Sequence, residues 1–526
     1  MKVSARCLGS PFLVATAFCL LAPAALASPE TDPYVVWSGE ATEPRPVLTT
    51  ALGETLLVGR LWLDGHIHQT TGFPIDARGT TYRGSAAADL TARPSVMWTS
   101  LRALLPVILK VEVEADFSIE KSIPVPIEGD GYPGALRGSG IDPRRASLGI
   151  SYGGVVGISA GLTPSHWGMG LIANDGTGGY SSANGSTVLT HGGDVVFRTA
   201  LALGPLSDAL NLKIAAAYDI LWSDDTLLDG DSGHQYVAAV SIEPIADSKL
   251  GVYAVRRHVS SQGPPSGGVH TTKSTDVWVV DMTGFGTISL SDTWSLRVEA
   301  EVAVIFGQTE LAPSRDYPVH DLLQLGAAAQ LRLEGPTWGA ILDFLYASGD
   351  QNFDDASQNA FKADTNYQLG FLFFNTVMAA ISARAVANAA DPEIVGYPSE
   401  DLHRLATRGA ISNTLSIYPR AWWRPAHGLE VFAGALLAFS NVPMADPLKS
   451  RVSGGQAKNA FGAVPGDYQG TELNLGLRYA ALIFGSHILF GLDAGVFIPG
   501  DALRGRGEGG LVDAVYGTRF SLGYQL

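Results

Sequence analysis

WSLRVEAEVAVIF, residues Trp294 to Phe306, is the stretch of this 526-residue chain that decides its fold. Every second side chain is apolar, and the face so formed carries Trp294, Leu296, Val298, Ala300, Val302, Val304 and Phe306. The opposite face carries Ser295, Arg297, Glu299 and Glu301. Because side chains alternate along a strand, a strand separates these two sets, whereas a helix would distribute the charges around its circumference. The segment therefore predicts a β-strand with one apolar face.

The same alternation recurs along the chain, for example over 323–333, 473–479 and 488–496, and again over 516–526. These stripes run for about ten residues, longer than the usual five or six of globular strands. Hydrophobic residues make up 46% of the chain and charged residues 16%, yet no segment after Ala27 has the ~18 uninterrupted apolar residues of a membrane helix. Only a closed barrel hydrogen-bonds all of its strand backbone in lipid. We therefore predict an all-β fold, a transmembrane antiparallel β-barrel of about 16–18 strands with long extracellular loops.

The N-terminal sequence has the pattern of a secretory signal peptide. A positively charged start precedes an apolar stretch from Pro11 to Leu21 and a small-residue run that ends at Ala27. That order is typical of a cleaved signal, and the apolar stretch is too short to span a membrane. We expect the outer membrane as the final location, with this organisation: signal peptide 1–27, periplasmic segment 28–48 and barrel 49–526.

Composition excludes several function classes. Cys7 and Cys19 both fall inside the predicted signal peptide, so the mature chain would have no disulfide, thiol nucleophile or thiolate metal site. The formal net charge of −16 disfavours nucleic acid as a partner, because phosphate binding needs a basic surface. Asp64, His66 and His68 lie at one strand end, but they are too few for a stable metal site. We expect no metal, no cofactor and no enzymatic activity.

Stretches rich in Gly, Asp, Ser and Pro are predicted to be the extracellular loops, and tryptophans near stripe ends are predicted to form interfacial girdles. The loops are Ser165–His191, Trp222–Gly233, Ser260–Lys273, Gln308–Val319, Ser348–Thr365 and Asn441–Asp467, and the tryptophans are Trp62, Trp222, Trp278, Trp338 and Trp423. Two stretches fit poorly, Gly84–Leu105 and Asn375–Ile411. Short helices, inward-folded loops and poor strands remain the alternatives for both.

One local motif resembles a known family of barrels. Tyr346-Ala347-Ser348-Gly349-Asp350, followed by Asp354, Asp355 and Phe361, resembles the loop signature of the alginate-export family of outer-membrane barrels. The resemblance covers roughly Leu322 to Phe439, and it implies an 18-stranded barrel whose lumen passes an anionic polysaccharide or small solutes. A second segment, Ser165 to Gly176, is similar to uncharacterised outer-membrane proteins of myxobacteria. That second similarity implies no activity.

A channel for anions would need basic side chains on its inner wall, because a ring of charge selects the opposite ion. The polar faces of the predicted strands supply these pore-lining candidates: Arg60, Lys110, Arg198, Lys213, Arg257, Arg297, Glu299, Glu301, Arg332, Arg420 and Arg478. The competing interpretation is structural, in which inward arginines only pair with inward carboxylates such as Asp493. The sequence leaves both interpretations open.

The sequence therefore predicts a monomeric, porin-like channel that passes small solutes or exports a secreted polysaccharide. Two alternatives remain. His258 and Ser260 could act as base and nucleophile of a barrel lipid hydrolase, or a plugged barrel could use its long loops for surface binding. The expected partners are outer-membrane lipid, lipopolysaccharide and periplasmic polysaccharide-export proteins.

Overall fold

The computed structural model describes residues 48–52, 55–84, 86–100, 107–123, 140–176, 193–224, 226–228, 230–262, 272–311, 314, 316–399, 401–483, 486–506 and 509–525. The predicted signal peptide lies outside the described residues, as does the periplasmic segment up to its last residue, Leu48. No helix in the described part of the chain is long and apolar enough to cross a membrane.

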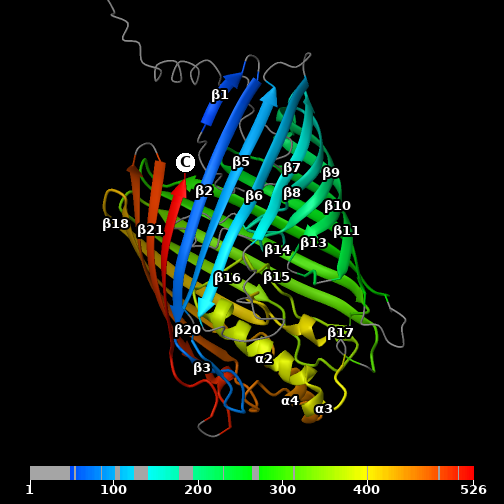
Figure 1. The fold of residues 1–526 in the computed structure, drawn as a ribbon. Helices are drawn as coiled ribbons and strands as arrows, with labels where there is room; N and C mark the ends of the chain where they lie inside the picture. The colour runs from blue at the N-terminus through cyan, green and yellow to red at the C-terminus, as the bar shows by residue number, and fades with distance from the viewer. Residues whose placement is uncertain are drawn as a thin grey trace, which may run out of the picture.

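Eighteen long antiparallel strands form a closed barrel (Figure 1). They are β2 (Thr55–Thr70), β5 (Ala86–Ser100), β6 (Val107–Ile123), β7 (Gly140–Tyr152), β8 (Val156–Pro164), β9 (Val195–Leu206), β10 (Leu212–Ser223), β11 (Asp231–Ile242), β12 (Ser248–Gln262), β13 (Thr272–Ser289), β14 (Ser295–Thr309), β15 (His320–Glu334), β16 (Trp338–Ala347), β18 (Thr414–Ala426), β19 (Leu429–Phe439), β20 (Tyr468–Ile483), β21 (Ser486–Pro499) and β22 (Val515–Gln525). The first and last of these strands pair from Trp62↔Gln525 to Thr70↔Gly517, which closes the ring. The predicted fold class is confirmed.

Shorter elements lie at the two ends of the barrel and inside it. They are β1 (Leu48–Leu52), which extends the wall beside β2, the hairpin β3 (Phe73–Pro74) and β4 (Thr81–Tyr82), and β17 (Ser357–Gln358). The helical elements are η3 (Ser207–Ala209), η4 (Phe373–Met378), α2 (Ala379–Ala390), α3 (Pro392–Val395), η5 (Leu402–Leu405), α4 (Pro447–Val452) and η6 (Asp501–Leu503).

The two ends of the barrel differ in the length of their connections. Tight turns such as His427-Gly428 join strands at one end, where β22 also finishes, and the long connections that the structure describes, such as those after β16, β19 and β21, lie at the other end (Figure 1). Outer-membrane barrels have short periplasmic turns and long extracellular loops. The short-turn end, at the top of Figure 1, is therefore the periplasmic end.

The alternation in the sequence becomes an inner and an outer wall. On β14, Glu301 and Ala303 are buried on the lumen side, whereas Val302 and Phe306 are exposed on the outside at 44% and 42%. The other strands repeat this pattern, so the outer wall carries a broad apolar band that suits hydrocarbon.

Four of the five tryptophans that were expected in the girdles are exposed on the outer wall. Trp222 and Trp278 lie toward the extracellular end, and Trp338 and Trp423 lie toward the periplasmic end. The prediction for Trp62 was wrong. Its side chain is only 2% exposed and faces the lumen, where Arg93 lies over its ring, because even-numbered positions of β2 point inward.

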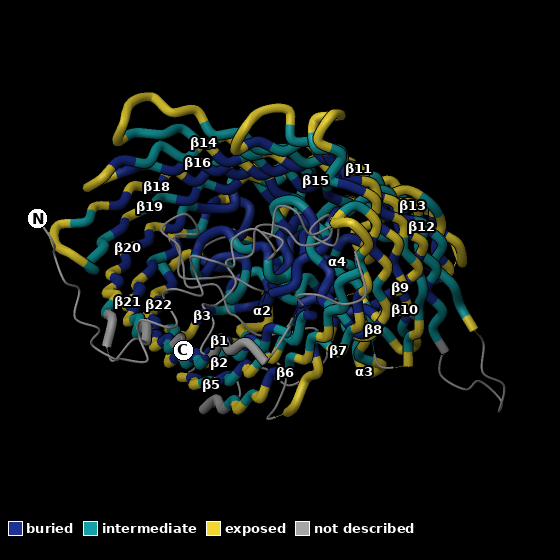
Figure 2. The backbone as a smooth tube through the Cα atoms, turned by 90° about the horizontal axis from the view of Figure 1, so that it is seen from above, coloured by how far each residue is buried: buried dark blue, intermediate teal, exposed yellow. Residues whose placement is uncertain are grey.

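The two stretches that fitted poorly have different structures. Gly84–Leu105 contains the regular barrel strand β5. Asn375–Ile411 contains most of η4, together with α2, α3 and η5, and belongs to a long loop between β16 and β18 that folds into the barrel. Figure 2 shows this loop and other buried segments inside the ring of strands.

Candidate functional site: the barrel lumen

All eleven pore-lining candidates lie on the inner face of their strands, because each alternates with outward-facing neighbours. In the order of the strands they are Arg60, Lys110, Arg198, Lys213, Arg257, Arg297, Glu299, Glu301, Arg332, Arg420 and Arg478. This placement leaves their role in conduction a prediction. Most of the cations among them pair with carboxylates, whereas Arg332 pairs with none in the described part of the chain.

Most inner-wall cations pair with a carboxylate on a neighbouring strand or loop. Arg198 donates two hydrogen bonds to Asp219, of 2.7 Å from Nε and 2.8 Å from Nη2. Arg420 similarly binds Asp343 through Nε at 3.0 Å. Lys213 and Arg257 form ion pairs with Glu243 and Asp224 at 2.8 and 2.7 Å. The structural interpretation therefore accounts for these four cations.

Arg332 differs from these paired cations. It lies directly opposite Arg297 in the β14–β15 register, and two like charges facing each other repel. Its Nη2 donates to the Gln330 side chain at 2.9 Å, while its buried Nε has no hydrogen-bond partner. In the described part of the chain, no carboxylate oxygen lies within 4.0 Å of the Arg332 guanidinium. Glu334 and Glu299 attract Arg332 only from beyond 4.0 Å, so its guanidinium forms no close ion pair on the described part of the wall.

Two carboxylates of the inner wall hold loops inside the barrel. Glu301 on β14 accepts backbone N–H bonds from Met169 and from Leu171, the latter at 3.1 Å. The loop that it holds joins β8 to β9, and its Gly168 has φ +57° beside the Glu301 carboxylate. A side chain at that glycine would collide with the carboxylate, so the close approach requires glycine.

Glu472 on β20 repeats this arrangement for the loop between β16 and β18. Its carboxylate accepts N–H bonds from Phe371, from Leu372 at 3.1 Å and from Phe373 at 2.7 Å. Gly370, which precedes them, has φ +75° and lies against the same carboxylate. Negative charge at these N–H groups also stabilises the start of the helical run η4–α2. Glu472 therefore fixes the point where this loop enters the lumen.

The inward loops pack against each other in a hydrophobic core, which we call the loop core. Leu171 from the first loop, Phe361 and Val377 from the second, and Phe497 of β21 are all fully buried in it. The Asp364 N–H donates to the Leu171 carbonyl at 2.9 Å, so the two loops are also joined by backbone. The loop core lies inside the ring of strands, where it narrows any path for solutes (Figure 2).

The family-signature loop contributes to the loop core. The Ser348 hydroxyl donates to the Asn359 carbonyl at 2.7 Å, and Asp350 accepts N–H bonds from Asn352 and Asn359. Phe361 packs on Gly326 of β15, where no side chain would fit. The remaining signature residues lie close by: Gly349 against Asn413, Asp354 beside Ser314, and Asp355 bonded to Ser357. The signature therefore closes a loop onto the wall.

Lys362 is buried within the same loop and gives it a pH dependence. Its Nζ donates to the carbonyls of Arg404 and Ala406 at 2.6 and 2.8 Å. Burial, reinforced by the nearby charges of Arg408 and Arg404, lowers the pKa of Lys362 from 10.5 to about 7. Because the folded loop favours the neutral amine, the loop gains stability as pH rises from about 7 toward 10.5.

We therefore expect the protease half-life of this loop in the wild-type protein to lengthen relative to Lys362→Met between pH 7 and pH 10. Methionine keeps most of the length of the side chain but does not titrate, so it removes this contribution. Limited proteolysis of the refolded barrel at pH 6, 8 and 10 measures the ratio of the wild-type half-life to the Lys362→Met half-life. The activity of the protease at each pH is normalised on an unfolded peptide. A half-life ratio that stays constant across this pH range would contradict a lowered pKa of Lys362 in the folded loop.

The remaining candidates of the sequence do not form catalytic or metal sites in the described part of the chain. His258 and Ser260 point outward from β12, and His258 Nδ1 lies 3.2 Å from Asp276 Oδ2, but no hydrogen bond joins Ser260 to His258. His66 binds Asp89 through Nδ1 at 2.7 Å. No group of three or more potential ligands there could hold a metal ion.

Comparison with known proteins supports the architecture. The structure is similar to that of OccAB1 from Acinetobacter baumannii, with a TM-score of 0.50 and 11% sequence identity, over 93% of this chain and 99% of that chain. The protein is an outer-membrane β-barrel. The outer-membrane barrel is also similar to the outer membrane protein OprD of Pseudomonas aeruginosa, with a TM-score of 0.47 and 11% identity, over 93% of this chain and 98% of that chain. No family model and no curated protein matches the sequence.

Proposed function

We propose that this barrel is a porin-like outer-membrane channel that passes small solutes and favours anions. The observation that carries the proposal is Arg332, an inner-wall cation opposite a second arginine, with no carboxylate oxygen of the described part of the chain within 4.0 Å of its guanidinium. Fixed positive charge on the inner wall of a channel attracts anions and repels cations. Neutralised pairs such as Arg198–Asp219 contribute little to this selectivity.

The loop core favours small solutes over a polymer. A polysaccharide would have to displace packed side chains of two loops, whereas a small solute needs only a gap beside them. The alginate-export resemblance thus stays a proposal, because the similar structures support an outer-membrane barrel but not that family. We propose a monomer that contacts lipopolysaccharide; periplasmic export proteins would be needed only if a polymer were the cargo.

Planar-bilayer recordings of the refolded protein test this function. Steady single-channel conductance, with a reversal potential of anionic sign in a salt gradient, is the expected result. A protein that gives no measurable conductance would contradict the channel function. It would favour the second candidate function, a plugged barrel whose loops bind at the cell surface. The packing of the loop core is the observation that favours that candidate.

Replacement of Arg332 tests its role directly. We expect Arg332→Gln to lower the anion-over-cation permeability ratio about twofold, equivalent to a screened interaction of about 0.4 kcal/mol with the permeating ion. Arg256→Gln is the matched control, because Arg256 lies on the outer face of β12, where it pairs with Asp276. Reversal potentials under a salt gradient give the ratio. An equal change in both variants, or none in Arg332→Gln, would exclude Arg332 from the selective site.

A further inference from the structure

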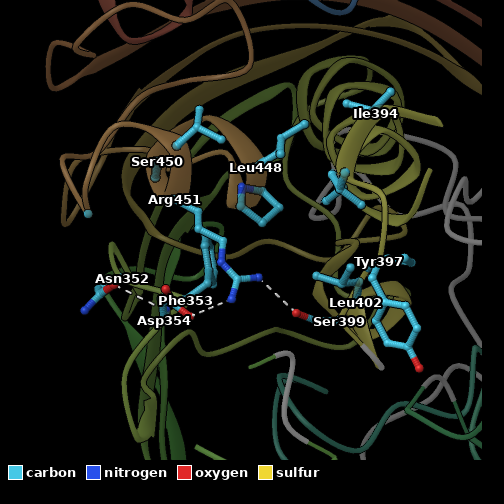
Figure 3. A pocket seen from close by; sticks show the side chains of 16 residues that line it. Asn352, Phe353, Asp354, Ile394, Tyr397, Ser399, Leu402, Leu448, Ser450 and Arg451 are labelled. Carbon is cyan, nitrogen blue, oxygen red and sulfur yellow. Dashed lines mark hydrogen bonds and ion pairs between the residues drawn. The ribbon is translucent and has the colours of Figure 1, made fainter. Parts of the chain in front are cut away.

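A pocket of about 380 Å³ lies among the extracellular loops. Four segments line it: residues 352–354 after β16, the end of α2 with α3, residues 397–399 together with Leu402, and α4 with the residues that follow it (Figure 3). Its volume is near the lower end of the range of about 300–1,000 Å³ for small-molecule sites. Its walls include Ala389 of α2 and Leu402 of η5, which both pack in the loop segment that fills the barrel mouth.

The charged groups of the pocket neutralise one another. Arg451 of α4 crosses the pocket, where its Nη1 donates to the Ser399 hydroxyl at 3.0 Å and its Nη2 lies 3.5 Å from Asp354 Oδ1 (Figure 3). Arg451 and Asp354 are the two formally charged side chains among the lining residues. A charged ligand would therefore meet one attractive and one repulsive group, so the pocket favours a neutral molecule.

The polar groups lie together, and apolar surfaces lie beside them. Asn352, Asp354, Ser399 and Arg451 present amide, carboxylate, hydroxyl and guanidinium groups, which can both donate and accept hydrogen bonds. The rest of the lining is mainly apolar or aromatic: Phe353, Ile394, Val395, Tyr397, Pro398, Leu402, Pro447, Leu448 and Val452. A ligand that matches this pocket has hydroxyl groups along its edges and C–H groups on its faces.

We propose that this pocket binds a neutral saccharide of one or two sugar units at the extracellular mouth. The proposal goes beyond the proposed function, because the paired charges of the pocket favour a neutral molecule at the entrance, whereas the anion preference belongs to the inner wall. The Arg451–Asp354 pair and Ser399 would bind the hydroxyl edge, while Phe353, Tyr397 and Leu448 cover the C–H faces. The same chemistry is presented by a free sugar in the medium and by sugar units of lipopolysaccharide.

Calorimetric titration of the full-length protein in detergent tests the site. We expect maltose to bind with a Kd in the millimolar range, and succinate and lysine to bind at least tenfold more weakly. Arg451→Leu, which removes the polar edge, and Val395→Trp, which fills the pocket, should each weaken maltose binding at least tenfold. Arg504→Leu is the matched control, because Arg504 is an exposed arginine in another extracellular loop and does not line the pocket.

Competition by purified lipopolysaccharide distinguishes the two sources of sugar. If lipopolysaccharide displaces maltose, surface glycan is the ligand; if it does not, the ligand is a free solute. No binding of either sugar source, or binding that is equal in wild type and in both pocket variants, would overturn the proposal. Heat-modifiable migration on gels verifies that each variant is folded. Conductance is recorded on the same samples, so a failure of the pocket is distinguishable from a failure of the channel.

Discussion

Glu472→Ala is expected to raise the single-channel conductance at least about twofold and to make the loop between β16 and β18 sensitive to protease. The substitution leaves the N–H groups of Phe371, Leu372 and Phe373 without their acceptor. Each buried donor left unpaired costs about 1–3 kcal/mol. A total of several kcal/mol is enough to populate conformations in which the loop leaves the lumen.

Three further variants test this explanation. Glu472→Gln keeps one acceptor oxygen and should give a smaller increase. Gly370→Val should reproduce the increase from the loop side, because valine is strained at φ +75° and would press on the carboxylate. Glu334→Gln is the control, because it removes an equal charge from the periplasmic end of β15, where Glu334 faces Arg424. If conductance and protease resistance match wild type in Glu472→Ala, Glu472→Gln and Gly370→Val, then Glu472 does not hold the loop in the lumen.

The strands could be predicted from the sequence because alternation is a local property. In β14, ten consecutive residues from Glu299 to Gln308 are enough to assign the inner and outer faces. The inner-wall candidates follow from the same rule, and all eleven lie on that face. The prediction for Trp62 did not follow the alternation of side chains. Trp62 and Arg60 both occupy even-numbered positions on β2, so alternation places both of them on the lumen side.

The pairing of charges could not be predicted from the sequence, since it depends on strand register. Arg420 and Asp343 are 77 residues apart and meet only because β16 and β18 are neighbours across a long loop. In the sequence, Glu472 is one polar residue among others on a strand face, and nothing there predicts that it binds a loop. A weak signal did exist: Gly370 precedes a run of apolar residues, and such a glycine often marks a close approach of backbone.

The structure of Asn375–Ile411 could also not be predicted from local sequence patterns. Helix α2 is rich in alanine and buried on most of its surface, so it has no single apolar stripe to identify it. Its partners come from distant segments: Arg384 of α2 binds Asp76 of the β3–β4 hairpin at 2.7 Å, and Arg404 of η5 binds Asp231 of β11 at 2.9 Å. Such a helix is stable only within the lumen that surrounds it.

Asp219→Ala is expected to lower the free energy of unfolding by about 3–5 kcal/mol, the usual cost of leaving one charge of a buried ion pair alone. Asp219 is fully buried, and it accepts both Arg198 bonds and a third bond of 2.9 Å from Gln235. The double variant Arg198→Met/Asp219→Leu removes both charges and should recover most of the loss. Arg332→Gln should change stability by less than about 1 kcal/mol, because no carboxylate oxygen in the described part of the chain lies within 4.0 Å of the Arg332 guanidinium.

Reversible denaturant unfolding of the barrel in lipid bilayers gives the free energy of unfolding of wild type, Asp219→Ala, the double variant and Arg332→Gln. This contrast separates the two interpretations of the inner-wall arginines, because a structural arginine affects stability whereas a selective arginine affects the permeability ratio. If Arg332→Gln destabilised the barrel as much as Asp219→Ala, Arg332 would be a structural residue. If the double variant stayed as unstable as Asp219→Ala, the loss would come from packing around β9 and β10 and not from the unpaired charge.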